Sequence, residues 1–181
     1  MYTMEEEAIR LVVKAFENQK RLKEDINLSF HSISVGFMLK DIGCSNDVVV
    51  SGLLHDIIED TSFDYNYIES NFGKVIADNV LAVSEDKTIE DWKDRKVKFM
   101  DNLNKQSADV IMIELADKLH NLISDYDLWK IKGEEALSTL KSTYSDNKWY
   151  YKEMGKIFNE NLTDNKLLDR YNEIIEIYFS R

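Results

Sequence analysis

The stretch SADVIMIELADKLHNLISDY, residues 107–126, is the most apolar helical segment of the chain and anchors the predicted fold. Its apolar residues recur every three or four positions, which predicts a helix from about 107 to 125. The β-branched run inside it could also form a short buried strand, but the pattern continues beyond ten residues and favours the helix. Asp117 falls within the apolar stripe. A carboxylate there costs several kcal/mol unless it is paired or bound to a metal.

The rest of the chain also favours helices. It has no proline and only six glycines, so few residues interrupt a helical pattern. DVVVSG (47–52) could form a strand, but the cap SND (45–47) and the length of the segment favour a helix. We therefore predict one all-α domain, a single compact helical bundle. The expected helices cover roughly 3–23, 28–41, 46–60, a short segment ending at 73, 74–85, part of 87–103, 107–125, 133–160 and 163–180.

Composition narrows the class of protein. A net charge of −11 argues against binding to a nucleic acid polymer, which requires basic residues to neutralise phosphates. No run approaches the ~20 apolar residues of a membrane helix, and MYTMEEEAIR (1–10) lacks the pattern of a signal peptide. Cys44 is the one cysteine, so no intrachain disulfide can form. These features predict a cytoplasmic protein.

A second stretch, LLHDIIEDT (53–61), places polar groups inside an aliphatic run. Its histidine and three carboxylates, His55, Asp56, Glu59 and Asp60, need a partner if they are buried. One helix cannot complete a coordination sphere, so a metal ion would also need ligands from elsewhere, and His31 and Asp117 are the candidates. Each of these residues taken singly is more often structural than functional, and spacing alone leaves both interpretations open.

The combination of HDIIEDT (55–61) and LADKLHN (115–121) resembles the HD superfamily of metal-dependent phosphohydrolases. Within it, the chain is most similar to the (p)ppGpp hydrolase domain of stringent-response synthetase/hydrolases and to their small single-domain relatives. NQKR (18–21) and WKDRK (92–96) are similar to further stretches of that family. The resemblance covers about residues 10–155. It implies one HD domain over 1–181, with a core at about 8–155 and C-terminal helices to 181.

The resemblance also implies roles for individual residues. It makes His31, His55, Asp56 and Asp117 the ligands of one divalent ion, with Mn²⁺ expected, and it makes Glu59 and Asp60 the catalytic acids. Asn121 matches a position that contacts substrate. Basic residues that could hold phosphate are Lys20, Arg21, Arg95, Lys96 and Lys118. His120 is expected to be a packing residue or a neighbour of a ligand, and Trp149, Tyr150 and Tyr151 match a helix near the family's pocket, although core packing explains them equally well.

The implied activity is that of a guanosine-3′,5′-bis(diphosphate) 3′-pyrophosphohydrolase, which uses a metal-bound water on a small phosphorylated nucleotide. The stretch RLKEDINLSFHSI (21–33) lacks the family's Gly and Pro-Tyr before the first histidine and the Pro after it. This departure leaves two alternatives, a nucleotidase or phosphatase on another substrate and a catalytically silent HD-fold binding module. A plain helical interaction domain would instead keep the four ligand residues apart. The sequence leaves a homo-oligomer open.

Overall fold

The computed structural model describes residues 2–21, 25–139 and 142–180, and within these ranges the chain is helical, with one isolated antiparallel bridge between Lys20 and Asn27. The all-α prediction is confirmed. The helices are α1 (Met4–Ala15), α2 (Ser29–Asp41), α3 (Asn46–Leu54), α4 (Ile57–Asp60), α5 (Tyr65–Phe72), α6 (Lys74–Ala82), α7 (Trp92–Leu103), α8 (Ala108–Lys132), the 3₁₀ helix η1 (Gly133–Thr139), α9 (Tyr144–Asn161) and α10 (Lys166–Phe179).

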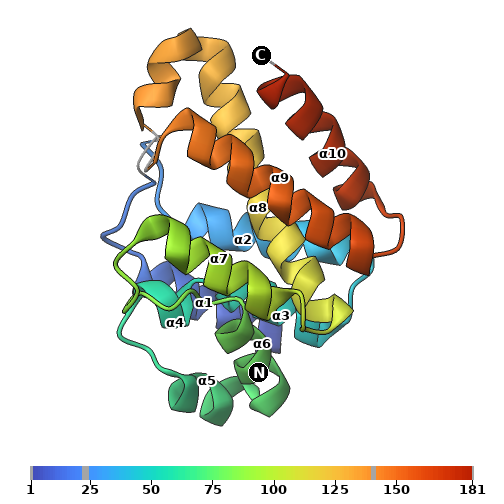
Figure 1. The fold of residues 1–181 in the computed structure, drawn as a ribbon. Coiled ribbons are helices and arrows are strands. Elements are labelled where there is room, and N and C mark those ends of the chain that lie inside the picture. Colours follow the sequence, from blue (N-terminus) through green and yellow to red (C-terminus); the bar gives the residue numbers. More distant parts are fainter. Residues whose placement is uncertain (1, 22–24, 140–141, 181) are drawn as a thin grey trace.

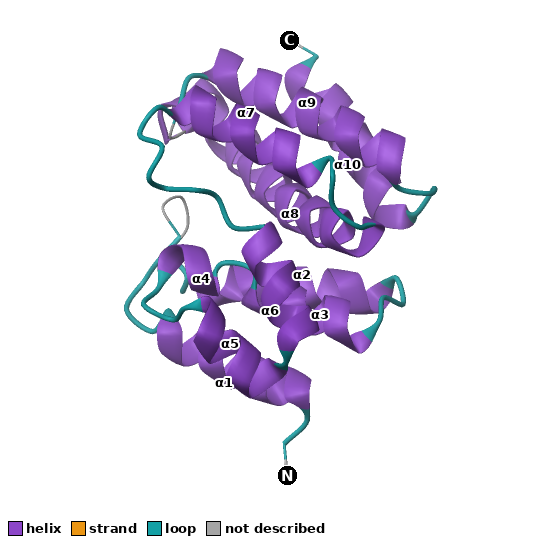
Figure 2. Cartoon of the chain, turned by 60° about the horizontal axis from the view of Figure 1, so that its bottom comes forward, coloured by secondary structure: helices purple, strands orange, loops and turns teal. Residues whose placement is uncertain are grey.

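The longest helix, α8, connects two groups of helices. Helices α7 to α10 lie on one side of the molecule and α1 to α6 on the other, as Figure 2 shows. In Figure 1, α8 runs through the centre. It packs against α9 and α10 in its own group and against α2 and α3 in the other. The middle of α8 is buried because it faces both groups, which explains why its sequence is so apolar.

Two glycines allow α2 and α3 to pack very closely. A Cβ atom at Gly36 would lie 2.4 Å from Leu53 Cδ2, and one at Gly52 would lie 2.3 Å from Leu39 Cδ1. Both separations are far below van der Waals contact, so a larger residue at either position would force the facing buried leucine or the helices to shift. This close approach matters for function because one candidate histidine ligand, His31, lies on α2 and the other, His55, directly follows α3.

The first predicted helix was too long. The observed helix α1 ends at Ala15 rather than near residue 23, and the predicted end at 22–23 lies outside the described residues. The side-chain amide of Asn27 donates to the carbonyl oxygens of Phe16 at 2.8 Å and Glu17 at 3.1 Å. These bonds satisfy backbone acceptors just after the helix and hold the chain in a turn.

The predicted helices at 46–60 and 133–160 are each divided. The first is broken between Leu54 and Ile57 into α3 and α4. In the second, α8 extends to Lys132 and ends where Gly133 takes a φ of +60°, a left-handed backbone that favours glycine. The 3₁₀ helix η1 and then α9 follow, and residues 140–141 between them lie outside the described residues.

The remaining helices follow their predicted positions. Ser45 caps α3 by accepting from the Val48 N–H, as the predicted cap requires, and Gly73 ends α5 with a φ of +91°. Both runs that could have formed strands are helical. Among the described helices, none combines the length and the apolar character needed to cross a bilayer.

Candidate functional site

The break between α3 and α4 positions two of the predicted ligands. His55 Nδ1 lies 2.8 Å from the carbonyl oxygen of Gly52. Since a carbonyl can only accept, Nδ1 carries the proton and Nε2 presents its lone pair to the site. Asp56 lies inside the break, and its Oδ2 is 3.1 Å from His55 Nε2. Both residues keep right-handed helical backbone angles, so these neighbouring side chains meet over the edge that their two directions share.

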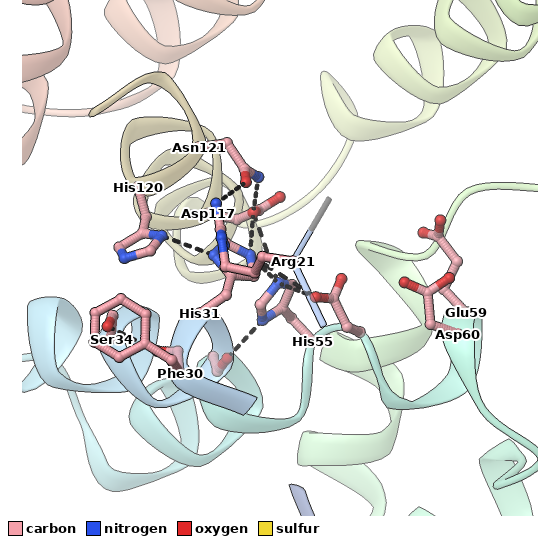
Figure 3. A network of polar contacts seen from close by, with 12 residues as sticks. Arg21, Phe30, His31, Ser34, His55, Glu59, Asp60, Asp117, His120 and Asn121 are labelled. Carbon is pink, nitrogen blue, oxygen red and sulfur yellow. Dashed lines mark hydrogen bonds and ion pairs between the residues drawn. The ribbon is translucent and has the colours of Figure 1, made fainter. Parts of the chain in front are cut away.

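The other two predicted ligands come from distant parts of the chain. His31, in the first turn of α2, places its Nε2 3.2 Å from His55 Nε2. The same atom lies 2.9 Å from Asp117 Oδ1 of α8 and 3.8 Å from Asp56 Oδ2. One ligand atom from each of His31, His55 and Asp117 lies within 4.8 Å of the other two. Figure 3 shows these side chains converging from three helical segments.

The electrostatics of this cluster favour a cation at its centre. Burial lowers the pKa of His55, but the carboxylates of Asp56 and Asp117 outweigh that effect and raise it to about 10. Burial raises the pKa of Asp56, yet His55 and then His31 hold it below its ordinary value. One buried and one partly buried carboxylate, held against two imidazoles, therefore favour positive charge between them.

The geometry also fits a divalent ion. His31 Nε2 lies 2.9 Å from the ligand oxygen of Asp117 and 3.8 Å from that of Asp56, and the other separations measured in the cluster fall between these two values. Ligands that each stand about 2.0–2.2 Å from one ion have separations of this size. Two nitrogen and two carboxylate donors suit a borderline divalent cation. The site predicted from sequence is thus brought together, whereas a plain interaction domain would have kept these residues apart.

His120 stands behind His31. Its Nδ1 lies 2.8 Å from His31 Nδ1, and its ring meets Phe30 edge-on. Burial, with the neighbouring His31 and Arg21, lowers the pKa of His120 to about 3. A neutral His120 can accept the Nδ1–H of His31, which leaves His31 Nε2 directed at the cluster. The expectation that His120 supports a ligand agrees with this contact.

The carboxylate of Asp117 is held on both oxygens. Lys118 Nζ donates to Oδ2 at 2.6 Å, and the Asn121 side-chain amide donates to Oδ1 at 2.6 Å. Lys118 also pairs with Glu114 Oε1 at 2.9 Å. Burial opposes ionisation of Asp117, but Lys118 and then the two histidines keep its pKa well below the ordinary range. Asp117 is therefore a fixed anion that faces His31.

Glu59 and Asp60 lie beside the cluster and line the same cavity. Glu59 Oε2 accepts the backbone N–H of Glu85 at 2.9 Å, and burial raises the pKa of Glu59. Lys87 donates to the Glu59 carbonyl oxygen at 3.0 Å and also contacts the carboxylate of Asp60. The predicted catalytic pair is thus anchored next to the candidate metal centre, and Lys87 is a partner that sequence reasoning missed.

A cavity of about 520 Å³ opens over this centre. Four of the basic residues predicted to hold phosphate line it, namely Lys20, Arg21, Lys96 and Lys118, and so does Asn121. Arg21 Nη2 donates to Asn121 Oδ1 at 3.4 Å and to Ser124 Oγ at 3.1 Å. The cavity is lined by Gln19, Lys20, Arg21, Leu28, His31, His55, Asp56, Glu59, Asp60, Val83, Glu85, Trp92, Lys96, Asp117, Lys118, Asn121, Asp125, Ser142, Asn147, Tyr150 and Tyr151.

The structure places Arg95 outside this lining. Its Nε donates to Glu85 Oε2 at 3.1 Å and its Nη1 donates to the Ile89 carbonyl oxygen at 2.8 Å. Arg95 therefore holds the segment before α7. Glu85 is the residue that it supports, and no feature of the sequence distinguished Glu85 from an ordinary surface acid. Lys118, by contrast, could be found from its position next to Asp117 in a buried stripe.

Comparison with known proteins identifies the family of the chain. A family profile described as HD domain matches residues 8–141. The chain is 33% identical over 128 residues to probable GTP diphosphokinase RSH3, chloroplastic, of Arabidopsis thaliana, covering 67% of this chain and 18% of that protein. It is 37% identical over 94 residues to guanosine-3′,5′-bis(diphosphate) 3′-pyrophosphohydrolase MESH1 of Drosophila melanogaster, covering 51% of this chain and 52% of that protein.

A solved structure gives the same fold. It is described as "A metazoan ortholog of SpoT hydrolyzes ppGpp and plays a role in starvation responses", and it superposes with a TM-score of 0.80 at 24% identity. The match covers 98% of this chain and 97% of that one. By sequence, the chain spans 18% of the length of the Arabidopsis relative and about half of MESH1. The HD domain profile covers most of the chain and includes all four predicted ligands, so the chain belongs to the HD domain family.

Proposed function

We propose that this protein is a metal-dependent phosphohydrolase that releases pyrophosphate from the 3′ position of a guanosine-3′,5′-bis(diphosphate)-like nucleotide. The observation that carries the proposal is the convergence of His31, His55 and Asp117 at the base of a cavity whose wall holds Glu59 and Asp60. A cluster of metal-ligand side chains next to two carboxylates in a cavity is an arrangement that can hydrolyse a phosphate ester.

The relatives support the choice of substrate. MESH1 carries the name of a guanosine-3′,5′-bis(diphosphate) 3′-pyrophosphohydrolase, and it matches this chain over 94 residues. The structural neighbour is described as a protein that hydrolyses ppGpp. We extend this activity to the present chain because the shared HD domain contains its candidate metal centre.

His31, His55, Asp56 and Asp117 would hold one divalent ion, and we propose Mn²⁺. Imidazole nitrogens combined with carboxylate oxygens suit Mn²⁺ and leave room for water, whereas a closed zinc site would favour thiolates. When bound, such an ion lowers the pKa of a water and polarises a phosphoryl oxygen. The protein supplies the fixed ligand geometry through His120, Lys118 and Asn121.

Glu59 and Asp60 would act on the attacking water. The raised pKa of Glu59 brings this carboxyl closer to neutral pH, where a group that accepts and returns a proton is most effective. In the proposed reaction the water oxygen bonds to the phosphorus attached to the ribose 3′ oxygen. The bond between that phosphorus and the 3′ oxygen breaks, and the 3′ oxygen takes up a proton. The products are pyrophosphate and a nucleotide with a free 3′ hydroxyl.

The cavity residues would hold the rest of the substrate. Lys20, Arg21, Lys96 and Asn121 line the cavity and provide donors for phosphate and ribose oxygens. Arg95 would act indirectly, because its guanidinium holds Glu85. We further propose one HD domain over 1–181, a cytoplasmic location, and no nucleic acid or membrane partner. The same proposal leaves assembly as a homo-oligomer open.

The direct test is hydrolysis. Purified protein is stripped of metal, reloaded with Mn²⁺ and incubated with ppGpp and a panel of other nucleotides, and the products are separated by chromatography. We expect pyrophosphate from ppGpp, and we expect a chelator or Glu59→Gln to abolish its release. Release of phosphate from another nucleotide would change the assigned substrate and leave the metal-dependent mechanism in place. Bound Mn²⁺ without turnover of any compound would instead indicate a binding module.

A further inference from the structure

Tyr150 of α9 occupies a fixed position in the wall of the cavity. The residue is 4% exposed, and its ring meets the ring of Trp92 edge-on at a centroid distance of 6.0 Å. The ammonium of Lys96 lies 4.5 Å from the centre of the Tyr150 ring, within the range of a cation–π contact. Two residues of α7 therefore hold the ring in place, and Tyr150, Trp92 and Lys96 all line the cavity.

The hydroxyl of Tyr150 is buried and has no hydrogen-bond partner among the described residues. A buried hydroxyl without a partner costs about 1–3 kcal/mol, and a phenylalanine would fill the same space without that cost. Tyr171 of α10 provides a contrast, because its buried hydroxyl donates to the Tyr151 carbonyl oxygen at 2.8 Å. The stability of the fold explains the hydroxyl of Tyr171. It does not explain that of Tyr150, which suggests a ligand.

The charges around Tyr150 indicate the kind of ligand. Lys96 and Lys118 line the cavity with it, and Lys118 also touches Asp117 of the candidate metal centre. Each lysine already has an acidic partner, since Glu85 pairs with Lys96 and Glu114 pairs with Lys118. The neutral Tyr150 hydroxyl adds a hydrogen-bond donor beside Lys96 and Lys118, whose charges are already balanced by their acidic partners. Phosphoryl oxygens accept such bonds.

We propose that the Tyr150 hydroxyl donates a hydrogen bond to the distal phosphate of a substrate diphosphate, while the phosphate under attack lies at the His31–His55–Asp117 cluster. Tyr150 then makes the site select a diphosphate ester over a monophosphate ester. This inference rests on the proposed function for the position of the substrate. What it adds to the proposed function is a pyrophosphate subsite formed by Tyr150 with Lys96 and Lys118.

The subsite is tested by binding, which needs no turnover. Pyrophosphate and orthophosphate are titrated calorimetrically into the protein in buffer with excess Mn²⁺, using the wild type, Tyr150→Phe and the matched control Tyr171→Phe. We expect Tyr150→Phe to weaken pyrophosphate binding by about 10- to 100-fold, the usual effect of losing one hydrogen bond to a charged group, and to leave orthophosphate binding unchanged. Its melting temperature should stay the same or rise. Tyr171→Phe should lower the melting temperature and leave pyrophosphate binding unchanged.

The outcomes separate this inference from the proposed function. Pyrophosphate binding that depends on Tyr150 in a protein that does not hydrolyse ppGpp would support the subsite and refute the activity. Hydrolysis of ppGpp with equal pyrophosphate affinity in wild type and Tyr150→Phe would support the activity and refute the subsite. Wild-type protein that does not bind pyrophosphate would also refute it. A lower melting temperature for Tyr150→Phe would mean that the hydroxyl has a structural partner, and it would overturn the inference too.

Discussion

The Nε2 atoms of His31 and His55 lie 3.2 Å apart, although 24 positions separate the two residues in the chain. Each ring is fixed through its other nitrogen, His31 by His120 and His55 by the Gly52 carbonyl oxygen. Both lone pairs therefore face one point, where the carboxylate of Asp117 also arrives. A metal ion at that point would depend on every one of these contacts.

Replacing Asp117 by asparagine should abolish metal binding and activity together. The substitution keeps the shape of the side chain and removes the anion that faces His31. We expect Mn²⁺ affinity to fall by more than the roughly 10- to 100-fold that loss of an outer partner of a metal ligand costs. Metal content after dialysis, measured by mass spectrometry, checks this. Asp127→Asn on the same helix, whose carboxylate pairs with Lys130 at the surface, is the control and should retain the metal. Full metal content in Asp117→Asn would exclude this residue as a ligand.

Glu59→Gln should separate metal binding from turnover. The glutamine can still accept the Glu85 N–H through its amide oxygen, so the loop should stay in place. Because the amide cannot take up a proton, we expect kcat to fall by about 10²- to 10⁴-fold at unchanged Mn²⁺ content. Steady-state kinetics on Mn²⁺-loaded protein provide the measurement, with Glu90→Gln, an exposed acid outside the cavity lining, as the control. If Glu59→Gln turned over substrate at the wild-type rate, the role given to this carboxylate would be wrong.

Glu114 should make the metal-free protein less stable as the pH rises. Burial, opposed by Lys118, raises the pKa of Glu114 to about 7, above its value of about 4.5 in the unfolded chain. Between these values the folded state binds more protons than the unfolded state, so the free energy of unfolding falls as the pH increases. We expect Glu114→Gln to match the wild type near pH 4.5 and to be more stable than it at pH 8.

Urea unfolding at several pH values in the presence of a chelator provides the comparison for Glu114. Glu173→Gln, an exposed acid on α10, serves as the control and should follow the wild type throughout. The prediction would be wrong if the free energy of unfolding of the wild type rose relative to that of Glu114→Gln between about pH 4.5 and pH 8. In that case the Lys118–Glu114 ion pair would outweigh the burial of the carboxylate.

Gly36→Ala should destabilise the fold and weaken the metal site. The new Cβ would lie 2.4 Å from Leu53 Cδ2, so the buried Leu53 side chain or the helices α2 and α3, which position His31 and His55, must shift. Overpacking of this kind costs about 1–3 kcal/mol. Gly155→Ala in α9 is the milder comparison and should cost less, because its Cβ would lie 3.3 Å from Tyr171 Cε1, a contact that a shift of a few tenths of an ångström relieves, and alanine favours the helix over glycine. Denaturant midpoints and Mn²⁺ affinity of the two variants test the difference, and equal stability of Gly36→Ala and wild type would contradict it.

The sequence by itself determined that the chain is helical, and it predicted which residues carry the chemistry. Apolar residues at helical spacing and the absence of proline were sufficient for the all-α fold, because burial of one helix face dominates local structure. Burial of HDIIEDT and LADKLHN indicated that their histidine and carboxylates need partners, and spacing alone left a structural role open. The resemblance to the HD superfamily then singled out the four residues that meet at the centre. The assignment of ligands and catalytic acids, and the single domain over 1–181, stay predictions.

Only the tertiary structure decided how these residues meet. The helix is interrupted at His55 and Asp56. Apolar residues on both sides of the interruption keep the helical spacing, so the sequence pattern could not show where α3 ends and α4 begins. The distance between α2 and α3 depends on side chains that face Gly36 and Gly52 from another helix. The structure alone also showed that the Tyr150 hydroxyl has no partner among the described residues. It alone showed that Arg95 donates to Glu85, which lies on another segment of the chain. Spacing within one helix is fixed by local geometry, whereas these contacts are fixed by how separate helices pack.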